Sequence, residues 1–347
     1  MVPWAAPTLS RRGRPRPSSW EARSALSGIR SKLLSILGSA GIERRLQRVE
    51  QTLANLMARI GASPETSGQT ALGPVRGPMA VFMGNGRLLC RLAIPEIHDP
   101  DIIYLMDAAD RMLVPRIAME GIYEPETTRF AIRHLHEHSH CIDIGANFGY
   151  FTCIMARCAW RGRTIAVEAD PEVFAQLRDN ININWSIGAA TPLNRAASDQ
   201  AGTLRLWRRV GRAANTSIVA PDPSTIALTG EDPSEPFDVA TIRVDDLLDQ
   251  LDGRVDLLKV DVEGAEPLVF RGARETLARN PAMVVVMEWS PGQLHGAGFP
   301  PGDFADELRG YGLHPYAIRS GGTIEPISWD EVRDVDYGNI ALRSERV

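Results

Sequence analysis

The chain has 347 residues, of which 44% are hydrophobic and 23% charged, as in a soluble globular protein that buries a core. Its formal net charge of −5 is uneven, because residues 1–60 hold 11 basic and 3 acidic side chains while the rest holds 27 basic and 40 acidic. An acidic body repels phosphate backbones, which excludes nucleic acid as the main substrate, and no run of about 18 apolar residues predicts a membrane span.

The N-terminal region differs in composition from the rest of the chain. Residues 1–20 are rich in Pro, Ser and Arg and are predicted to be a disordered basic tail. The Arg pair at 11–12 suggests twin-arginine export, but no clean apolar region or small-residue cleavage site follows it. The four cysteines lack metal-type spacing and indicate reduced thiols, so a cytoplasmic location is expected.

A helical segment is predicted next, over residues 21–62. From residue 42 to residue 60 the apolar positions alternate four and three apart, which is the spacing of a coiled coil. This run is too short to distinguish a coiled coil that forms a homo-oligomer from an amphipathic helix packed on its own domain. Residues 63–78, rich in Gly, Pro and Ser, are predicted to be a linker.

Residues 79–347 form the predicted catalytic body, in which strand-like and helix-like stretches alternate. This alternation is typical of a mostly parallel sheet with helices on both faces. Asp170 is placed to cap one helix, Pro171 suits its first turn, and a second helix is predicted over 267–280. The final strand is predicted to be antiparallel. Seven strands are predicted, over residues 140–145, 163–168, 191–197, 255–262, 283–289, 313–319 and 337–343.

The first of these strands runs into a glycine-containing turn in the stretch "CIDIGANFGYFT". In an open α/β sheet such a turn lies at the carboxyl end of the strand, where glycines let the backbone approach a nucleotide. Asp143 opens the motif, and Gly145 and Gly149 suit that approach. Asn147 stands where a third glycine is common, so its backbone must tolerate a tight turn. The turn alone is also compatible with a plain strand-to-helix connection.

The next strand, "RTIAVEADP", places an acid at its carboxyl end. Glu168 follows Gly145 by 23 residues, close to the offset of roughly 20 at which an acid binds ribose hydroxyls. A full Gly-x-Gly-x-x-Gly motif is missing and no Arg or Lys stands ready for phosphate, so a nucleoside without phosphates fits better than a dinucleotide.

The stretch "VDLLKVDVEGAE", residues 255–266, reads as an apolar strand that contains one of only two lysines in the chain. Alternation along a strand sends Lys259, Asp261 and Glu263 to the same face. These polar residues lie toward the carboxyl end, so they are expected to converge on the ligand crevice. A buried unpaired charge costs several kcal/mol, so a lysine in this strand needs a partner. The alternative to a role in the ligand site is a purely structural ion pair between Lys259 and Asp261.

In their order and spacing these motifs resemble the FkbM-type methyltransferase family. The stretches that carry the resemblance are "IDIGANFGYFT", "AVEADP", "NRAASDQAG", "VDDLL" and "VDLLKVDVEGAEPLVFRGA", within about residues 79–345. The resemblance implies a Rossmann-like class I methyltransferase fold of α/β class, with S-adenosylmethionine as the cofactor. It also implies that the lead-in "EGIYEPETTRF" closes over the cofactor. The implied cofactor-binding residues are Asp143, Gly145, Asn147, Gly149, Glu168 and Glu124.

Methyl transfer gives the polar face of residues 255–266 a chemical role. A sulfonium methyl is already activated, so the protein mainly aligns the acceptor and, for a hydroxyl, removes its proton. Asp261 is the predicted base, and Lys259 is predicted to hold that carboxylate ionised and to stabilise a developing alkoxide. Glu263 completes the predicted catalytic set; it and Glu288 orient either the acceptor or the methionine amino group.

The acceptor is predicted from surface character alone. The acidic body and the polar segment 208–238, which is expected to be an acceptor lid, favour a neutral hydroxylated molecule. The prediction is therefore O-methylation of a sugar, a glycan or a polyketide-type natural product. Two alternatives remain, an NAD-dependent oxidoreductase, which shares the glycine turn and Glu168, and a non-catalytic scaffold that uses residues 42–60.

Four of the seven histidines, at positions 134, 136, 138 and 140, lie close together in the sequence. His134 and His138 would share a helix face, as metal ligands do. No zinc-protease motif surrounds them, and cationic histidines near a helix C-terminus are a sufficient explanation. No metal site is predicted.

Overall fold

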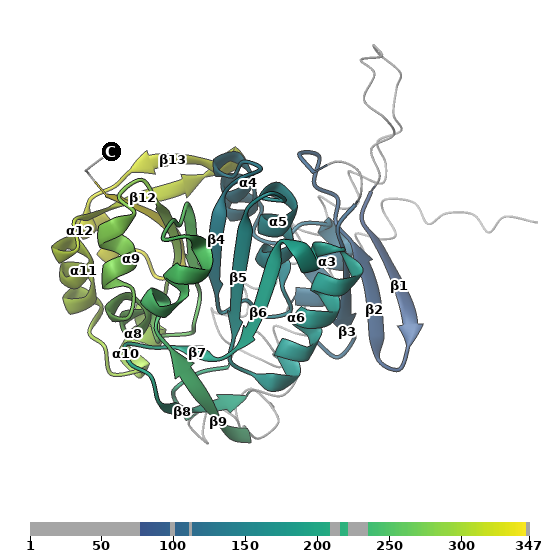
Figure 1. The fold of residues 1–347 in the computed structure, drawn as a ribbon, viewed down its shortest axis with the longest axis horizontal. Helices are drawn as coiled ribbons and strands as arrows, with labels where there is room; N and C mark the ends of the chain where they lie inside the picture. The colour runs from purple at the N-terminus through teal and green to yellow at the C-terminus, as the bar shows by residue number, and fades with distance from the viewer. Residues whose placement is uncertain (1–76, 98–100, 111–112, 209–215, 221–234, 345–347) are drawn as a thin grey trace, which may run out of the picture. The chain divides into compact units, whose positions relative to one another are not determined.

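The computed structural model describes residues 77–97, 101–110, 113–208, 216–220 and 235–344 (Figure 1). The chain divides into two units, Met1–Leu72 and Gly73–Val347, and all described residues belong to the second. The predicted tail, the helical segment with its heptads and nearly all of the linker lie outside the described residues. They remain predictions, as do the homo-oligomer and the cytoplasmic location.

The centre of the described part is a mixed sheet of eight strands in the order β13-β12-β14-β11-β10-β4-β5-β6. Neighbours among β11, β10, β4, β5 and β6 are parallel, whereas β12, β13 and β14 pair antiparallel. The predicted fold class and the antiparallel last strand are thus confirmed. The strands are β4 (His140–Ile144), β5 (Arg163–Glu168), β6 (Ala190–Asn194), β10 (Leu257–Val260), β11 (Val284–Trp289), β12 (Leu313–Arg319), β13 (Thr323–Pro326) and β14 (Gly338–Ser344).

The predicted number of seven strands is wrong, because β13 adds an eighth. It pairs with β12 through a hairpin in which Gly321 and Gly322 adopt positive φ angles of 73° and 74°. β13 has only four residues, and none of them is buried. A strand with no buried residues leaves no apolar alternation in the sequence, so this one could not be recognised.

The predicted strand 191–197 is divided between two sheets. β6 ends at Asn194, and Ala196–Ala197 form β7, which joins a separate sheet in the order β7-β9-β8. β8 (Thr203–Arg208) and β9 (Glu235–Ile242) pair antiparallel. A third sheet contains β1 (Met79–Gly84), β2 (Arg87–Arg91) and β3 (Ile103–Asp107).

Helices cover both faces of the central sheet (Figure 1). One face, with Ile142, Ile144 and Leu258, packs against the elements between β9 and β14; the other, with Cys141, packs against α4 and α5. The helices are α3 (Leu113–Glu120), α4 (Pro125–His134), α5 (Tyr150–Cys158), α6 (Pro171–Ile183), α8 (Glu266–Arg271), α9 (Arg274–Arg279), α10 (Pro291–Gly296), α11 (Pro301–Gly310) and α12 (Trp329–Arg333), with 3₁₀ turns η1 (Ser186–Gly188), η3 (Val244–Leu251) and η4 (Ser320–Gly322).

The predicted cap of α6 is confirmed, since the Asp170 side chain accepts hydrogen bonds from the backbone N–H groups of Glu172 and Val173.

The predicted helix 267–280 is interrupted between α8 and α9. A Cβ at Gly272 would lie 2.1 Å from the carbonyl oxygen of Ser198, so another segment packs directly on the backbone there. This close contact is not visible in a sequence.

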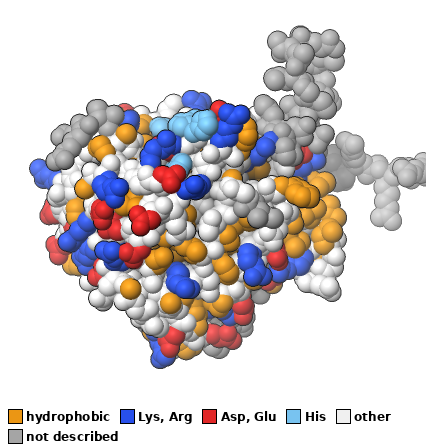
Figure 2. Space-filling model, in the orientation of Figure 1, with side chains coloured by type: hydrophobic (Ala, Val, Ile, Leu, Met, Phe, Trp, Pro, Cys, Tyr) orange, Lys and Arg blue, Asp and Glu red, His pale blue; other side chains and the backbone are white. Residues whose placement is uncertain are grey.

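None of the helices in the described part has the length and apolar character that crossing a bilayer requires. Figure 2 shows a group of histidine side chains on the visible face. His140 begins β4 and its Nδ1 lies 2.9 Å from the carbonyl oxygen of Leu251. The group thus sits at the amino end of β4, opposite the end where ligands bind in such sheets.

Candidate active site

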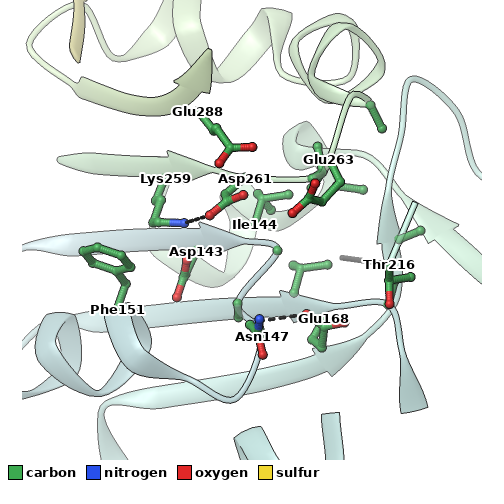
Figure 3. Close-up of a pocket in the computed structure, with 18 of the residues that line it drawn as sticks. Asp143, Ile144, Asn147, Phe151, Glu168, Thr216, Lys259, Asp261, Glu263 and Glu288 are labelled. Carbon is green, nitrogen blue, oxygen red and sulfur yellow. Dashed lines mark hydrogen bonds and ion pairs between the residues drawn. The ribbon is translucent and has the colours of Figure 1, made fainter. Parts of the chain in front are cut away.

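A cavity of about 380 Å³ opens at the carboxyl ends of β4, β5, β10 and β11 (Figure 3). This volume lies in the range of small-molecule sites. The sequence-predicted residues that line it are Asp143, Gly145, Asn147, Glu168, Lys259, Asp261, Glu263 and Glu288. The strand order thus brings together residues from distant parts of the sequence.

The turn after β4 is built around Gly145, which has a φ of 76°. Its N–H donates to the carbonyl oxygen of Val167 at 3.0 Å. A Cβ here would lie 1.8 Å from the carbonyl oxygen of Asp261, so glycine is required for the close approach of β4 and β10. At Gly149, which caps α5, a Cβ would lie 2.7 Å from Leu177 Cδ1, so that glycine makes room for α6.

Asn147 adopts the left-handed backbone expected at its position, with a φ of 51°. Its Oδ1 accepts a hydrogen bond from Phe148 N at 2.7 Å, a local contact that helps asparagine adopt this conformation. Its own N–H donates to Glu168 Oε2 at 2.8 Å. The turn after β4 is thereby attached to the end of β5.

Glu168 is held in place on both carboxylate oxygens. Besides the bond from Asn147, its Oε1 accepts from Asp170 N at 2.8 Å. Burial raises the pKa of Glu168 to about 7, although these backbone donors favour the charged form. The carboxylate therefore has a fixed orientation beside the cavity.

Asp143 is 1% exposed, and its two carboxylate oxygens differ in their hydrogen bonding. Its Oδ2 accepts from Thr152 Oγ1 at 2.6 Å, whereas its Oδ1 has no hydrogen-bond partner among the described residues. Burial raises the pKa of Asp143, and the nearby Lys259 ammonium counteracts the increase. A buried acceptor without a partner is costly, so this oxygen favours a ligand that donates to it.

Lys259 and Asp261 form an ion pair, with 2.8 Å between Lys259 Nζ and Asp261 Oδ2 (Figure 3). The side chains are 4% and 23% exposed, respectively, so the pair is open to the cavity on the Asp261 side. Burial disfavours the charged lysine, but the carboxylates of Asp261, Asp143 and Glu124 outweigh it and raise the Lys259 pKa. The Lys259 Nζ also lies 4.9 Å from the centre of the Phe151 ring.

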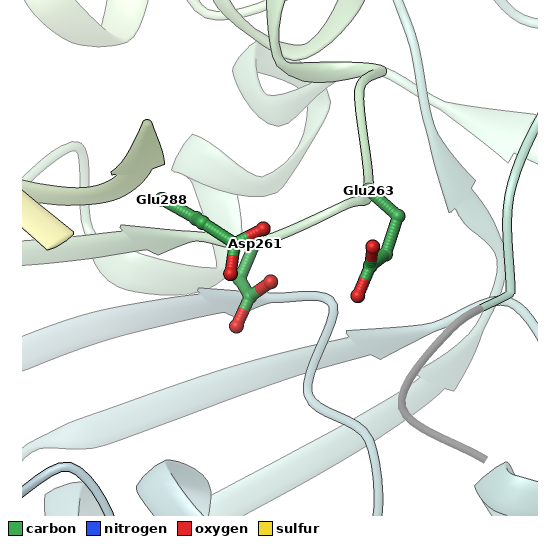
Figure 4. A group of neighbouring side chains, drawn as sticks. All are labelled: Asp261, Glu263 and Glu288. Carbon is green, nitrogen blue, oxygen red and sulfur yellow. The ribbon is translucent and has the colours of Figure 1, made fainter. Parts of the chain in front are cut away.

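Glu263 and Glu288 approach Asp261 from two directions (Figure 4). Glu263 has a φ of 54° in the loop after β10, and Gln293 Nε2 donates to its Oε2. Glu288 lies in β11 and accepts from the hydroxyl of Tyr337 at 2.5 Å. Burial and the charges of Asp261 and Glu263 raise the pKa of Glu288 well above the usual carboxyl range.

Glu124, the remaining predicted cofactor ligand, precedes α4 with a φ of 43°. Its Oε2 accepts from Asn339 Nδ2 at 2.8 Å. The cavity wall is formed by its neighbour Tyr123 rather than by Glu124 itself. The structure thus places Glu124 close enough to Lys259 to affect the lysine pKa, but not among the lining residues.

Of the predicted lid 208–238, residues 209–215 and 221–234 lie outside the described residues. In the described piece, Thr216 and Ile218 line the cavity. Ser217 Oγ donates to the carbonyl oxygen of Glu263 at 3.3 Å. This contact connects the segment to the loop after β10.

Several lining residues had no signal in the sequence. Gln293 and Tyr337 lie far along the chain from Asp261, and only the fold brings them near. The basic residues Arg116 and Arg195 also line the cavity, and both are exposed.

Comparison with known proteins gives a consistent assignment. The family described as "Methyltransferase FkbM domain" matches residues 143–312. A curated relative, methyltransferase sdnD of Sordaria araneosa, is 30% identical over 212 residues, which cover 53% of this chain and 81% of the relative.

Solved structures of low similarity were also found. Methyltransferase FkbM of Methylobacillus flagellatus KT has 11% identity and a TM-score of 0.38, and the match covers 60% of this chain and 44% of that chain. This chain thus spans less than half the length of that protein. An O-methyltransferase from Bacillus cereus in complex with SAH has 13% identity and a TM-score of 0.37, with 64% and 83% covered. At these scores the fold class rests on the strand order of the sheet itself.

Proposed function

The chain belongs to the FkbM methyltransferase family, and on that premise we propose that it is an S-adenosylmethionine-dependent O-methyltransferase. Its proposed acceptor is a hydroxyl group of a sugar, a glycan or a polyketide-type natural product. The observation that carries the proposal is the Lys259–Asp261 pair, which opens into the cavity on the carboxylate side.

The residues of the cavity fit S-adenosylmethionine. Glu168 stands at the end of β5, where an acid binds ribose hydroxyls. The Oδ1 of Asp143, which has no hydrogen-bond partner in the part of the chain that the structure describes, suits the ammonium group of the methionine part. When bound, S-adenosylmethionine supplies a methyl group on a sulfonium sulfur, which keeps the electron pair of the broken S–C bond.

The chain itself provides alignment and proton transfer. The acceptor hydroxyl loses its proton to Asp261 as its oxygen forms the new bond to carbon. Lys259 orients Asp261 through their ion pair and, from the same position, stabilises negative charge that develops on the acceptor oxygen. Glu263 and Glu288, each with a carboxylate oxygen within 4.8 Å of one of Asp261, orient the acceptor.

The NAD-dependent oxidoreductase alternative is set aside by the family assignment. The non-catalytic scaffold alternative predicts that no methyl group is transferred to any acceptor.

Incubation with S-adenosylmethionine labelled in its methyl group tests the proposal on a panel of sugars, glycans and hydroxylated polyketides. We expect labelled product with the label in an ether, which resists mild alkaline hydrolysis as a methyl ester does not. Mass spectrometry before and after alkali checks this result. Label on nitrogen, on carbon or in an alkali-labile ester would contradict the proposed O-methylation of a hydroxyl.

A further inference from the structure

Three carboxylates gather at the carboxyl ends of β10 and β11. Asp261, Glu263 and Glu288 each offer one oxygen, and these oxygens all lie within 4.8 Å of one another (Figure 4). Among the described residues, these three side chains are the His, Cys, Asp or Glu group that is spaced closely enough to hold a metal ion. Like charges at such distances repel, so the arrangement needs protons or a cation between the carboxylates.

Each of the three carboxylates is oriented by a different donor. Lys259 Nζ bonds Asp261 Oδ2, the Tyr337 hydroxyl donates to Glu288 Oε1, and Gln293 Nε2 donates to Glu263 Oε2. Carboxylates that ligate metal ions are themselves hydrogen-bonded by outer partners, which fix their direction. A donor of this kind is present for every member of the cluster.

Glu288 provides an independent sign of a missing ligand. It is 4% exposed and lines the cavity. Its Oε2 is buried and has no hydrogen-bond partner among the described residues. Buried carboxylate oxygens normally have a partner, so this oxygen favours a ligand in the cavity.

The charges of the cavity wall point to a cation. Among the described residues that line the cavity, five are acidic and three are basic; of the basic ones, Arg116 and Arg195 are exposed and Lys259 is buried. Lys259 Nζ pairs with Asp261 Oδ2 at 2.8 Å, and no hydrogen bond or ion pair joins a described basic side chain to Glu288.

We propose that Asp261, Glu263 and Glu288 bind a divalent cation with a preference for oxygen ligands, Mg²⁺ or Mn²⁺. Carboxylate and water oxygens suit these ions. In octahedral Mg²⁺ sites, with bonds near 2.1 Å, ligand oxygens lie about 3 Å apart when adjacent and about 4 Å when opposite. A small inward shift of the carboxylates, or a bridging water, reaches this geometry.

The cation also specifies an acceptor class, an inference that rests on the proposed function. Three protein ligands leave coordination positions for other oxygens, and Mg²⁺ sites commonly bind substrate oxygens directly. An acceptor with two adjacent oxygens, such as a vicinal diol, fills two such positions. The bound hydroxyl becomes more acidic, which eases loss of its proton.

Binding of Mn²⁺ alone tests the site without any methyl transfer. The full chain, stripped of metal with a chelator, is titrated with Mn²⁺, and free Mn²⁺ is measured by its electron paramagnetic resonance signal. We expect one site per chain, weakened at least tenfold by Glu288→Gln. A matched surface variant, Glu275→Gln, whose side chain is 58% exposed, is expected to bind as wild type does.

Wild-type protein that binds no Mn²⁺, or Glu288→Gln protein with unchanged affinity, would overturn the metal site. If Glu288→Gln does not fold, Glu263→Gln serves instead, because Glu263 lies in a loop outside the sheet. Binding of S-adenosylhomocysteine by the metal-free protein is measured in parallel. If the wild-type protein binds S-adenosylhomocysteine but no Mn²⁺, the metal site fails and the proposed function stands. If it does not bind S-adenosylhomocysteine, the proposed function fails.

The acceptor class has its own test. Chelation with EDTA is expected to lower methyl transfer to vicinal diols at least tenfold and to leave transfer to isolated hydroxyls less affected, with Mg²⁺ restoring activity. An equal rate with EDTA and with Mg²⁺ would overturn the role of the cation in acceptor binding while leaving the proposed function intact.

Discussion

Replacing Asp261 with asparagine is expected to lower the turnover number by about 10²- to 10⁴-fold, the usual contribution of a general base. The amide oxygen of asparagine can still accept the hydrogen bond that Lys259 Nζ gives to Asp261 Oδ2 at 2.8 Å. The site keeps its shape and loses only the group that takes the proton. Affinity for S-adenosylhomocysteine is therefore expected to remain at the wild-type level.

Steady-state kinetics and calorimetry with S-adenosylhomocysteine measure the two quantities separately. Asp330→Asn is a suitable control because its side chain is 92% exposed and lies outside the cavity. Loss of S-adenosylhomocysteine binding in Asp261→Asn would make Asp261 a cofactor ligand and end its assignment as the base.

Replacing Lys259 with methionine is expected to reduce the free energy of unfolding by about 3–5 kcal/mol. Methionine fills a similar volume, but Asp261 and the fully buried Asp143 lose the ammonium group that compensates them. Because the Lys259 pKa is raised in the folded state, its stabilising contribution is fully present below its ordinary pKa of 10.5 and is lost as the pH rises beyond it. The effect is therefore largest in neutral buffer.

Denaturant unfolding followed by tryptophan fluorescence measures this loss. Arg205→Met removes an exposed ion pair with Asp238 and is expected to change stability much less. If Lys259→Met is as stable as wild type at pH 7, the charged lysine does not compensate the buried carboxylates, and its proposed role with Asp261 fails.

The sequence predicted the parts of the site that follow from strand periodicity. The alternation in residues 255–266 put Lys259, Asp261 and Glu263 on one face. Lys259 and Asp261 do pair, and Leu258 and Val260 lie in the core on the other face. The alternation does not extend to Glu263, because β10 ends at Val260 and Glu263 has a positive φ in the loop that follows. A tight turn at Asn147 was predicted because it stands where a third glycine is common, and the residue has a positive φ of 51°. Local patterns of this kind need only one stretch of sequence.

Other parts depend on which segments meet in space. Gln293 and Tyr337 hold Glu263 and Glu288 from elements that follow β10 in the chain, and no spacing rule connects them. The edge strand β13 has no buried residue and thus no apolar period. The proximity of Asp261, Glu263 and Glu288 could not be predicted either, because Asp261 and Glu263 follow β10 whereas Glu288 lies in β11.

Calorimetric titration of the wild-type chain with S-adenosylhomocysteine tests most directly whether the ends of β4, β5 and β10 surround one adenosine-containing cofactor. We predict saturable binding of one molecule per chain and no binding of reduced NAD, which its fluorescence reports. Folded protein that gives no binding heat with S-adenosylhomocysteine at several temperatures, or that binds reduced NAD instead, would contradict the account.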